Sequence, residues 1–131
     1  MTQEEKQLLI IDLCARLPYG VKLFHNLSEK PITFNSGHLN QIGVYKIKPY
    51  LRPMSSMTDK EREEWADLFM KPICELGGYT DEKKAHDIAP ILYGKSHQVS
   101  IDWLNKKLFD YRGLIEKGLA LEAPEGMYKN E

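Results

Sequence analysis

The chain has 131 residues, a length that suits one domain able to bury a core without disulfides or metal. Hydrophobic residues make up 42% and charged residues 28%, which is ordinary globular usage and excludes wholesale disorder. The formal net charge is −1, and the longest apolar run, Leu8 to Ile11, is far shorter than the roughly 20 residues that cross a bilayer. Acidic Glu4 and Glu5 stand where a secretory signal would carry basic residues, so the sequence predicts a cytoplasmic protein with no membrane partner.

Charge is unevenly distributed along the chain. Residues 20–53 carry five Lys and Arg against one acid, a balance of +4, whereas residues 58–82 carry eight acids against three bases, a balance of −5. The two segments can attract each other, face different partners, or simply form two solvated faces.

The N-terminal segment has the pattern of an amphipathic helix. Thr2 and Glu5 form a capping box, and a predicted apolar face follows at helical spacing: Ile10, Leu13, Cys14 and Leu17. We expect a helix over residues 3–17, ended by Pro18 and Gly20. Cys14 then lies in the core, where burial suppresses thiolate formation.

Residues 20–53 read as a basic β meander followed by a connector. Three β-prone runs, 21–25, 32–34 and 41–47, are separated by turn residues, which predicts a small three-stranded, SH3-like or partial-barrel meander. The stretch 48–53 contains Pro49 and Pro53, which favour an extended connector over a helix or a central strand.

The C-terminal half predicts helices. Thr58 and Glu61 form a second capping box, opening an acidic helix over 58–76 with Trp65, Leu68 and Phe69 on its buried face. Residues 79–98 are expected to form a variable loop region with a short helix at most, because Pro90 and Gly94 interrupt the pattern. A C-terminal helical pair is expected over 100–123, its second helix capped by Asp110 and ended by Gly118, with a loosely held tail beyond Pro124. The predicted fold is a single α+β domain over 1–131.

The residues that could carry chemistry do not form a recognisable catalytic set. The sequence contains no phosphate-binding loop, dinucleotide fingerprint, nucleophile elbow or zinc-protease motif. The four histidines are scattered, and Cys14 and Cys74 lack metal-ligand spacing and read as free thiols. We therefore expect no catalytic residues, no metal and no cofactor, and a protein that is more simply explained as a binding protein than as an enzyme.

One surface candidate is the basic and aromatic stretch 45–52. Lys46, Lys48 and Arg52 could neutralise phosphates while Tyr50 stacks on a base, as a single-stranded nucleic-acid surface requires. The alternative is that Tyr50 docks the connector on the core and the cations stay solvated.

A second candidate is a protein-binding surface. It combines the connector 50–57 with the Asp-Tyr-Arg turn 110–112, and its residues are Tyr50, Arg52, Met54, Asp110, Tyr111 and Arg112. The structural alternative is that Asp110 caps a helix, Tyr111 packs on Trp103 or Phe109, and Arg112 pairs with Glu116.

Three stretches also carry a resemblance to a known group of proteins: 12–21 (DLCARLPYGV), 48–57 (KPYLRPMSSM) and 109–120 (FDYRGLIEKGLA). In these strings the chain resembles a family of short proteins of unassigned function from gut Bacteroides genomes and their prophages or mobile elements. The resemblance implies a regulatory or accessory role and supplies no site residues. We expect a non-enzymatic protein-interaction module with an unknown protein partner; the alternative is a nucleic-acid-binding regulatory module.

Overall fold

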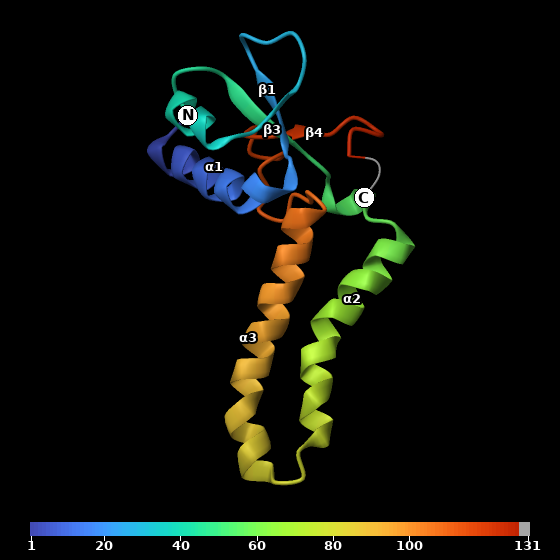
Figure 1. Cartoon of the computed structure of the whole chain (residues 1–131). Coiled ribbons are helices and arrows are strands. Elements are labelled where there is room, and N and C mark those ends of the chain that lie inside the picture. Colours follow the sequence, from blue (N-terminus) through green and yellow to red (C-terminus); the bar gives the residue numbers. More distant parts are fainter. Residues whose placement is uncertain (129–131) are drawn as a thin grey trace. The chain divides into compact units, whose positions relative to one another are not determined.

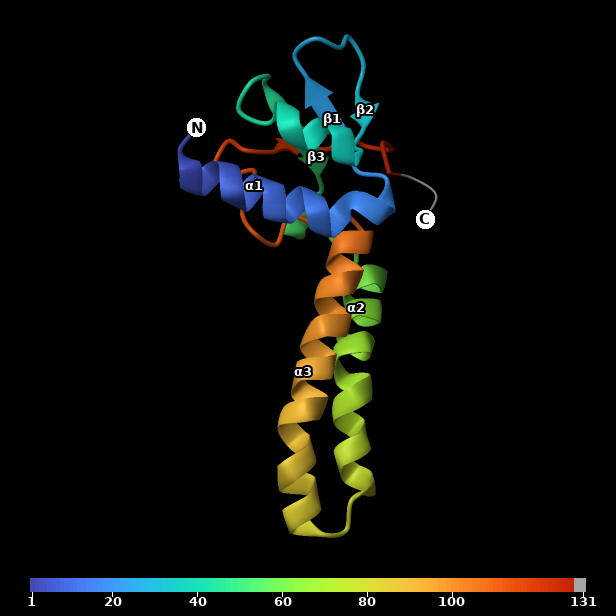
Figure 2. The ribbon, with the colours of Figure 1, turned by 60° about the vertical axis from the view of Figure 1, so that its left-hand side comes forward.

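The computed structural model describes residues 1–128, and it is an α+β structure (Figures 1 and 2). The strands form one mixed sheet in the order β2-β1-β3-β4. No helix among the described residues is long and apolar enough to span a bilayer. The elements are α1 (Gln3–Arg16), η1 (Leu17–Tyr19), β1 (Lys22–His25), β2 (Ile32–Thr33), η2 (Ser36–Gln41), β3 (Ile47–Leu51), η3 (Met54–Ser56), α2 (Asp59–Ile73), η4 (Cys74–Gly78), α3 (Glu82–Lys106) and β4 (Leu121–Glu122).

The chain divides into two compact units. The first, called here the sheet unit, is Met1–Ser56 together with the chain from Asn105 onward, and the second, the hairpin unit, is Met57–Leu104. The apolar core of the sheet unit lies between α1, the sheet and the C-terminal turns, and consists of Leu9, Leu13, Val21, Leu23, Phe34, Ile42, Ile47, Leu51, Leu108, Leu114, Leu119 and Ala120. A single domain over 1–131 stays a prediction.

Helix α1 begins at the predicted capping box, but the face it buries differs from the predicted one. Thr2 and Glu5 exchange both capping hydrogen bonds. The buried residues are Leu9, Asp12, Leu13 and Arg16, whereas Cys14 is exposed, so the prediction of a core Cys14 is wrong. The face is rotated because two charged side chains lie inside.

Asp12 and Arg16 form a buried ionic cluster with Arg112. Both side chains on α1 are fully buried, and the Arg16 guanidinium donates to both Asp12 carboxylate oxygens at 2.9 and 3.0 Å. Arg112 Nη1 donates to Asp12 Oδ1 at 2.6 Å, and Arg16 Nη2 donates to the Phe109 carbonyl at 2.6 Å. The cluster therefore ties the first helix to a turn about a hundred residues away along the chain.

Residues 48–51 of the predicted connector 48–53 belong to β3, a central strand, which corrects the expectation drawn from Pro49. Leu51 accepts a backbone hydrogen bond from Ala123 of the chain after β4, so it faces β4. Pro49, two residues earlier, faces the same way, one position before the β3–β4 pairing begins at Tyr50 and Leu121. A backbone N–H at position 49 would point away from β1, so proline, which lacks this donor, costs no hydrogen bond to β1. The ladder with β1 therefore continues through Leu23 and Pro49. The predicted third strand, 41–47, is displaced onto Ile47–Leu51, and residues 36–41 form η2 instead.

The tail beyond Pro124 is integrated into the sheet instead of being loosely held. Tyr128 places its hydroxyl between two strands, accepting from the Lys22 backbone N–H at 2.8 Å and donating to the Tyr50 carbonyl at 2.7 Å. These two groups lie one register position beyond the Leu23–Pro49 pair. A phenol thus replaces the next rung of the β1–β3 ladder. Residues 129–131, also in the predicted tail, lie outside the described residues.

Two helical expectations for the C-terminal half are also corrected. Residues 79–98, predicted as a variable loop, lie largely within the 25-residue helix α3, which includes Pro90 and Gly94. The predicted helical pair over 100–123 is the end of α3 followed by hydrogen-bonded turns and β4. The start of the acidic helix predicted over 58–76 is confirmed, because the Thr58 capping box is present and opens α2, which ends at Ile73 and continues into η4.

The second predicted C-terminal helix does not form, because residues 111–120 make turns and bends, but Asp110 and Gly118 still hold the two ends of this segment. The Asp110 carboxylate accepts from the Leu114 and Ile115 backbone N–H groups, both at 2.9 Å. Gly118, with φ of 74°, donates to the Ile115 carbonyl while Leu119 donates to the Leu114 carbonyl. This pattern is a Schellman closure, which requires the left-handed backbone that glycine adopts without strain.

We predict that Asp12→Ala destabilises the protein by about 3–5 kcal/mol, because it leaves the buried Arg16 guanidinium without its counter-ion. Urea unfolding followed by circular dichroism measures the change. The matched control is Asp59→Ala, which removes an ion pair to Arg62 whose side chains are 100% and 60% exposed, and should cost about 0–1 kcal/mol. Equal losses for the two variants would contradict the structural role of the cluster.

We further predict that the Tyr128 phenol ionises at a higher pH than an ordinary tyrosine. Burial raises the pKa of its phenol from 10.0 to about 12, against a smaller lowering by the Lys22 N–H that it accepts. The unfolded chain releases this proton first, so the contribution of Tyr128 to stability is complete below about pH 10 and falls as the pH rises toward 12. Tyrosinate absorbance should lose a step near pH 12 in Tyr128→Phe, and superimposable titrations of the variant and the wild type would refute this placement.

Candidate functional site

The outer face of the sheet carries basic and aromatic side chains in alternation with core residues. On β1, Leu23 and His25 are buried while Lys22 and Phe24 are partly exposed, and β3 repeats the pattern with Lys48 and Tyr50 partly exposed. Phe24 is directly opposite Lys48 in the antiparallel register, so the two side chains share one face. We call Lys22, Phe24, Lys48 and Tyr50 the outer sheet face.

Lys46 extends this face at the entry to β3. Its Nζ lies 6.0 Å from the centre of the Phe24 ring, within the range of a cation–π contact. The Lys46 backbone is fixed by Asn26, whose side chain accepts from its N–H at 3.1 Å and whose backbone N–H donates to its carbonyl at 3.1 Å. The backbone at the entry to β3 is thus held in place, while Lys46 itself is an exposed residue.

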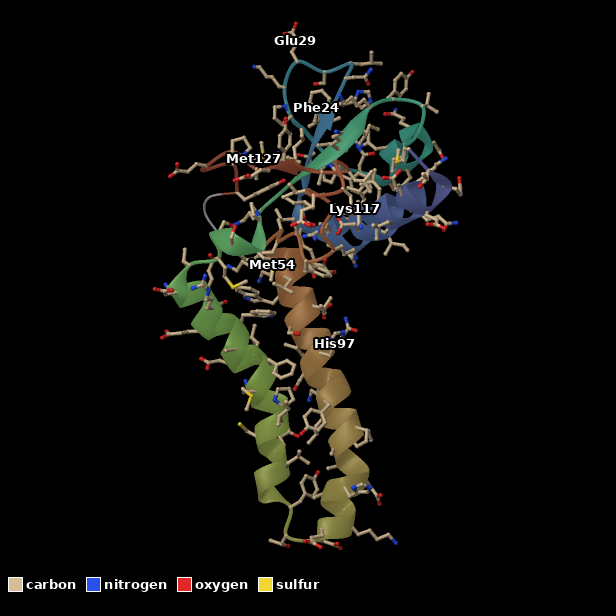
Figure 3. All side chains as sticks on the ribbon, turned by 180° about the vertical axis from the view of Figure 1, so that it is seen from behind. Phe24, Glu29, Met54, His97, Lys117 and Met127 are labelled. Carbon is tan, nitrogen blue, oxygen red and sulfur yellow. The ribbon has the colours of Figure 1, made fainter. Side chains whose placement is uncertain are left out.

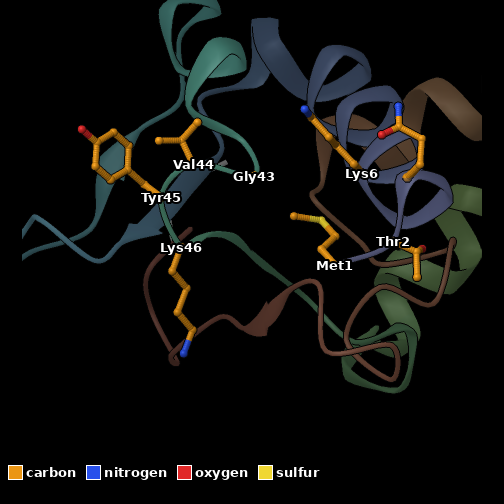
Figure 4. A pocket seen from close by; sticks show the side chains of 8 residues that line it. Met1, Thr2, Lys6, Gly43, Val44, Tyr45 and Lys46 are labelled. Atoms are coloured by element: carbon orange, nitrogen blue, oxygen red, sulfur yellow. The ribbon is translucent and has the colours of Figure 1, made fainter.

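A cleft opens beside Lys46, between the start of α1 and the segment that precedes β3. It has a volume of about 310 Å³, and Figure 4 shows the side chains that line it, including Met1, Lys6, Val44 and Lys46. Gly43 lies on its wall with φ of 90°, and a Cβ placed there would come 3.6 Å from the Lys6 side chain. A glycine here allows the left-handed backbone that brings the two walls together.

A second cleft of about 310 Å³ shares Met1, Tyr45 and Lys46 with the first. It also reaches Lys48 and the C-terminal turn at Lys117 to Leu119. Together the two clefts gather four lysines around one region, and we call them the lysine clefts: Lys6, Lys46, Lys48 and Lys117.

The acid in this region, Glu5, is already engaged. Its carboxylate accepts from the Thr2 backbone N–H at 2.8 Å, and its own backbone N–H donates to the Thr2 hydroxyl at 3.1 Å. The Thr2 hydrogen bonds lower the pKa of the Glu5 carboxyl below its ordinary value, with a smaller contribution from Lys117. Glu5 is therefore ionised at neutral pH, and it offsets part of the charge of the four lysines, which remain in excess.

Sequence reasoning found Lys46 and Lys48 but missed Lys6 and Lys117. The latter two are on α1 and on the turn before Gly118, far from the basic stretch along the chain. No local pattern marks a lysine that is brought to a cleft by tertiary packing. The proximity of all four follows only once α1 and the C-terminal turn are placed against the sheet.

The other predicted residues of the connector serve partly structural roles. Tyr50 is on the outer sheet face, and its carbonyl is held by Tyr128. The Arg52 guanidinium lies 4.1 Å from the Phe109 ring centre, and its backbone exchanges hydrogen bonds with Leu108 and Asp110. Met54 is a half-buried residue of η3. The basic-aromatic stretch is thereby split, with Arg52 packed against Phe109 in the sheet unit.

The Asp-Tyr-Arg turn lies among intramolecular partners. Asp110 is buried and caps the following turn, as the structural alternative predicted. Tyr111 donates its hydroxyl to Asn105 at 2.9 Å, and the guanidinium carbons of Arg16 and Arg112 lie 5.4 and 4.5 Å from its ring centre. Arg112 pairs with Asp12 instead of the expected Glu116. These three side chains are therefore already committed to contacts within the sheet unit.

The histidines near β1 also have structural partners. His25 is buried, its Nδ1 accepts from the Leu27 backbone N–H at 3.1 Å, and its Nε2 lies 2.9 Å from Gln41 Oε1. His38 Nδ1 accepts from the Asn35 backbone N–H at 3.0 Å. Within residues 1–128, no group of three or more His, Cys, Asp or Glu side chains is arranged to hold a metal ion.

Comparison with known proteins adds no family to this picture: no protein-family model, curated protein or solved structure matches the chain. The resemblance to short proteins of Bacteroides and their mobile elements thus stays a prediction.

Proposed function

We propose that the protein is a non-enzymatic module that binds single-stranded nucleic acid across the outer sheet face, with the lysine clefts receiving the phosphate backbone. The observation that carries the proposal is the direct pairing of Phe24 with Lys48, extended by Lys46 over the Phe24 ring. A single strand is recognised by rings that stack on bases and by cations that follow the backbone. The outer sheet face offers both within two adjacent strands.

The distribution of charge supports an anionic ligand on this unit. The sheet unit has twelve Lys and Arg against nine Asp and Glu, a net charge of +3, whereas the hairpin unit has six against ten, a net charge of −4. A ligand that carries phosphates is therefore attracted to the sheet unit and repelled by the hairpin unit. The overall charge of −1 conceals this difference.

The geometry favours this function over the protein-interaction surface expected from the sequence. Of the residues of that surface, Asp110, Tyr111 and Arg112 have intramolecular partners, and Arg52 packs on Phe109. Lys46, Lys48 and Tyr50 lie instead where a ligand can reach the sheet. We propose in addition that the sheet unit has an SH3-like or partial-barrel arrangement, since small barrels commonly present such faces to single strands. A regulatory role is part of the same proposal.

The electrostatic part of the proposal predicts that Lys46→Glu with Lys48→Glu weakens binding of a fluorescent oligothymidine and flattens its salt dependence. Each lost phosphate contact should lower the slope of log affinity against log salt by about 0.7. Fluorescence anisotropy at several salt concentrations measures both effects. Lys30→Glu, an exposed charge reversal in the same basic segment, is the matched control. Absence of binding by the wild-type protein at low salt would reject the proposal.

The stacking part predicts that Phe24→Ala weakens binding by about 1–3 kcal/mol with little change in the salt slope, because it removes a ring and no charge. Tyr19→Ala, which removes another partly exposed ring of the sheet unit, should leave the affinity unchanged. Circular dichroism confirms that both variants are folded. If the Phe24 and Tyr19 variants bind equally, the rings of the outer sheet face do not contact the bases.

A further inference from the structure

The hairpin unit has a narrow core. Helices α2 and α3 run antiparallel and are joined through η4 (Figure 1). Along α3, a series of buried and half-buried residues recurs at alternating spacings of four and three: Ala85, Ala89, Leu92, Ser96, Val99 and Trp103. Other residues buried or half-buried beside this series are Ile88, Ser100, Ile101 and Leu104. Trp65, Leu68 and Pro72 follow the same rule on α2. This is the repeat of a coiled-coil seam, which covers only one stripe of each helix.

The two sides that flank this seam differ in chemistry. In an antiparallel helix pair, the positions that directly follow the seam on both helices lie on one side of the pair, and those that directly precede it lie on the other. One side, called here the apolar side, has no Asp, Glu, Lys or Arg over its central part and consists of Ala66, Phe69, Ile73, Pro90, Tyr93 and His97. The other, the charged side, carries Lys60, Glu64, Asp67, Lys71, Lys84, Lys95 and Asp102.

The apolar side leaves large rings in contact with water. Phe69 is 39% exposed and Tyr93 is 52% exposed, although Phe69 was expected on the buried face of its helix. The Trp103 indole, by contrast, donates to Glu64 at 3.0 Å on the charged side, so that side is closed by a polar contact. Figure 3 shows the side chains along both helices, with His97 labelled on α3. Two helices alone cannot cover these rings, whereas four can.

We propose that the apolar side is the interface between two copies of this chain, which form an antiparallel four-helix bundle through their hairpin units. The charges of the two helices indicate how the copies meet. Helix α2 carries five acids against three bases, whereas the part of α3 in the hairpin unit, residues 82–104, carries three bases against three acids. A two-fold axis parallel to the helices places each acidic α2 against the uncharged stretch of α3 of the other copy, whereas the perpendicular alternative would bring the two acidic helices together.

The register follows from the contact between Glu64 and Trp103 in one hairpin. Five residues beyond Glu64, Phe69 lies level with Gln98, because the helices run in opposite directions with the same rise. A two-fold axis along the helices keeps these levels, so Phe69 of one copy meets His97 of the other. The 15 residues of α2 span about 22 Å, and two helices are about 20 Å wide. Two such faces bury on the order of 1,000 Å², which suits a concentration-dependent dimer.

Sedimentation equilibrium of the full chain at increasing concentration tests the proposal. The mass should rise from 15.2 kDa toward twice that value. Phe69→Glu and Tyr93→Ser should hold it at the monomer value. Ile91→Glu is the matched control, because Ile91 is an apolar residue that is more exposed, at 63%, and lies toward the charged side; it should dimerise as the wild type does. Circular dichroism verifies that the helices of each variant form.

The arrangement of the helices has its own test. With Cys14 and Cys74 replaced by Ser, an oxidised mixture of Phe69→Cys and His97→Cys variants should form the mixed disulfide in preference to either symmetric one. A dominant symmetric disulfide through position 69 would overturn the pairing of α2 with α3 of the other copy. A wild-type protein that stays monomeric at every concentration, or an Ile91→Glu variant that loses dimerisation as Phe69→Glu does, would overturn the proposal itself.

Discussion

The sheet unit depends on a carboxylate, that of Asp12, held in the interior by two guanidinium groups. Arg16 and Arg112 both donate to Asp12, and Arg16 also holds the Phe109 carbonyl. A buried charge is tolerated only when it is paired and hydrogen-bonded, so these contacts must form together. They fix which face of α1 points inward and where the chain returns after α3.

The same return of the chain positions the strands that carry the outer sheet face. Next to Phe109, whose carbonyl binds Arg16, the backbone of Arg52 pairs with Leu108 and Asp110 and thereby anchors the end of β3. Two residues before Arg52, at the same end of β3, the Tyr128 hydroxyl joins Tyr50 to Lys22 of β1. The lysines and rings alternate with core residues on these two strands, so the interior contacts determine the direction in which the ligand-facing side chains point.

The parts of the fold that could be predicted from the sequence are those set by local hydrogen bonds. The capping boxes at Thr2 and Thr58, the Asp110 cap and the turn at Gly118 all form as expected, because each involves residues a few positions apart. The buried face of α1 was misassigned, because Asp12 and Arg16 look like an ordinary surface pair until Arg112 joins them. The local sequence pattern does not indicate tertiary contacts of this kind.

Two further errors show packing outweighing local preference. Pro90 and Gly94 suggested a loop, yet the seam residues around them continue at helical spacing, and burial along α3 offsets the proline. Pro49 suggested a connector, yet its missing donor faces away from β1. At the candidate site, two of the four lysines could be predicted from the sequence, because Lys46 and Lys48 lie in one basic stretch. Lys6 and Lys117 could not, because they lie on elements distant along the chain.

Binding of single strands across the outer sheet face can be measured directly by amide chemical-shift mapping of the ¹⁵N-labelled protein during titration with oligothymidine at low salt. The largest changes should fall on Lys22 to His25, on Lys46 to Leu51 and on the turn at Lys117 to Leu119, and they should fade as salt is added. Changes centred on α2 and α3, or a spectrum that does not respond, would contradict binding at this face.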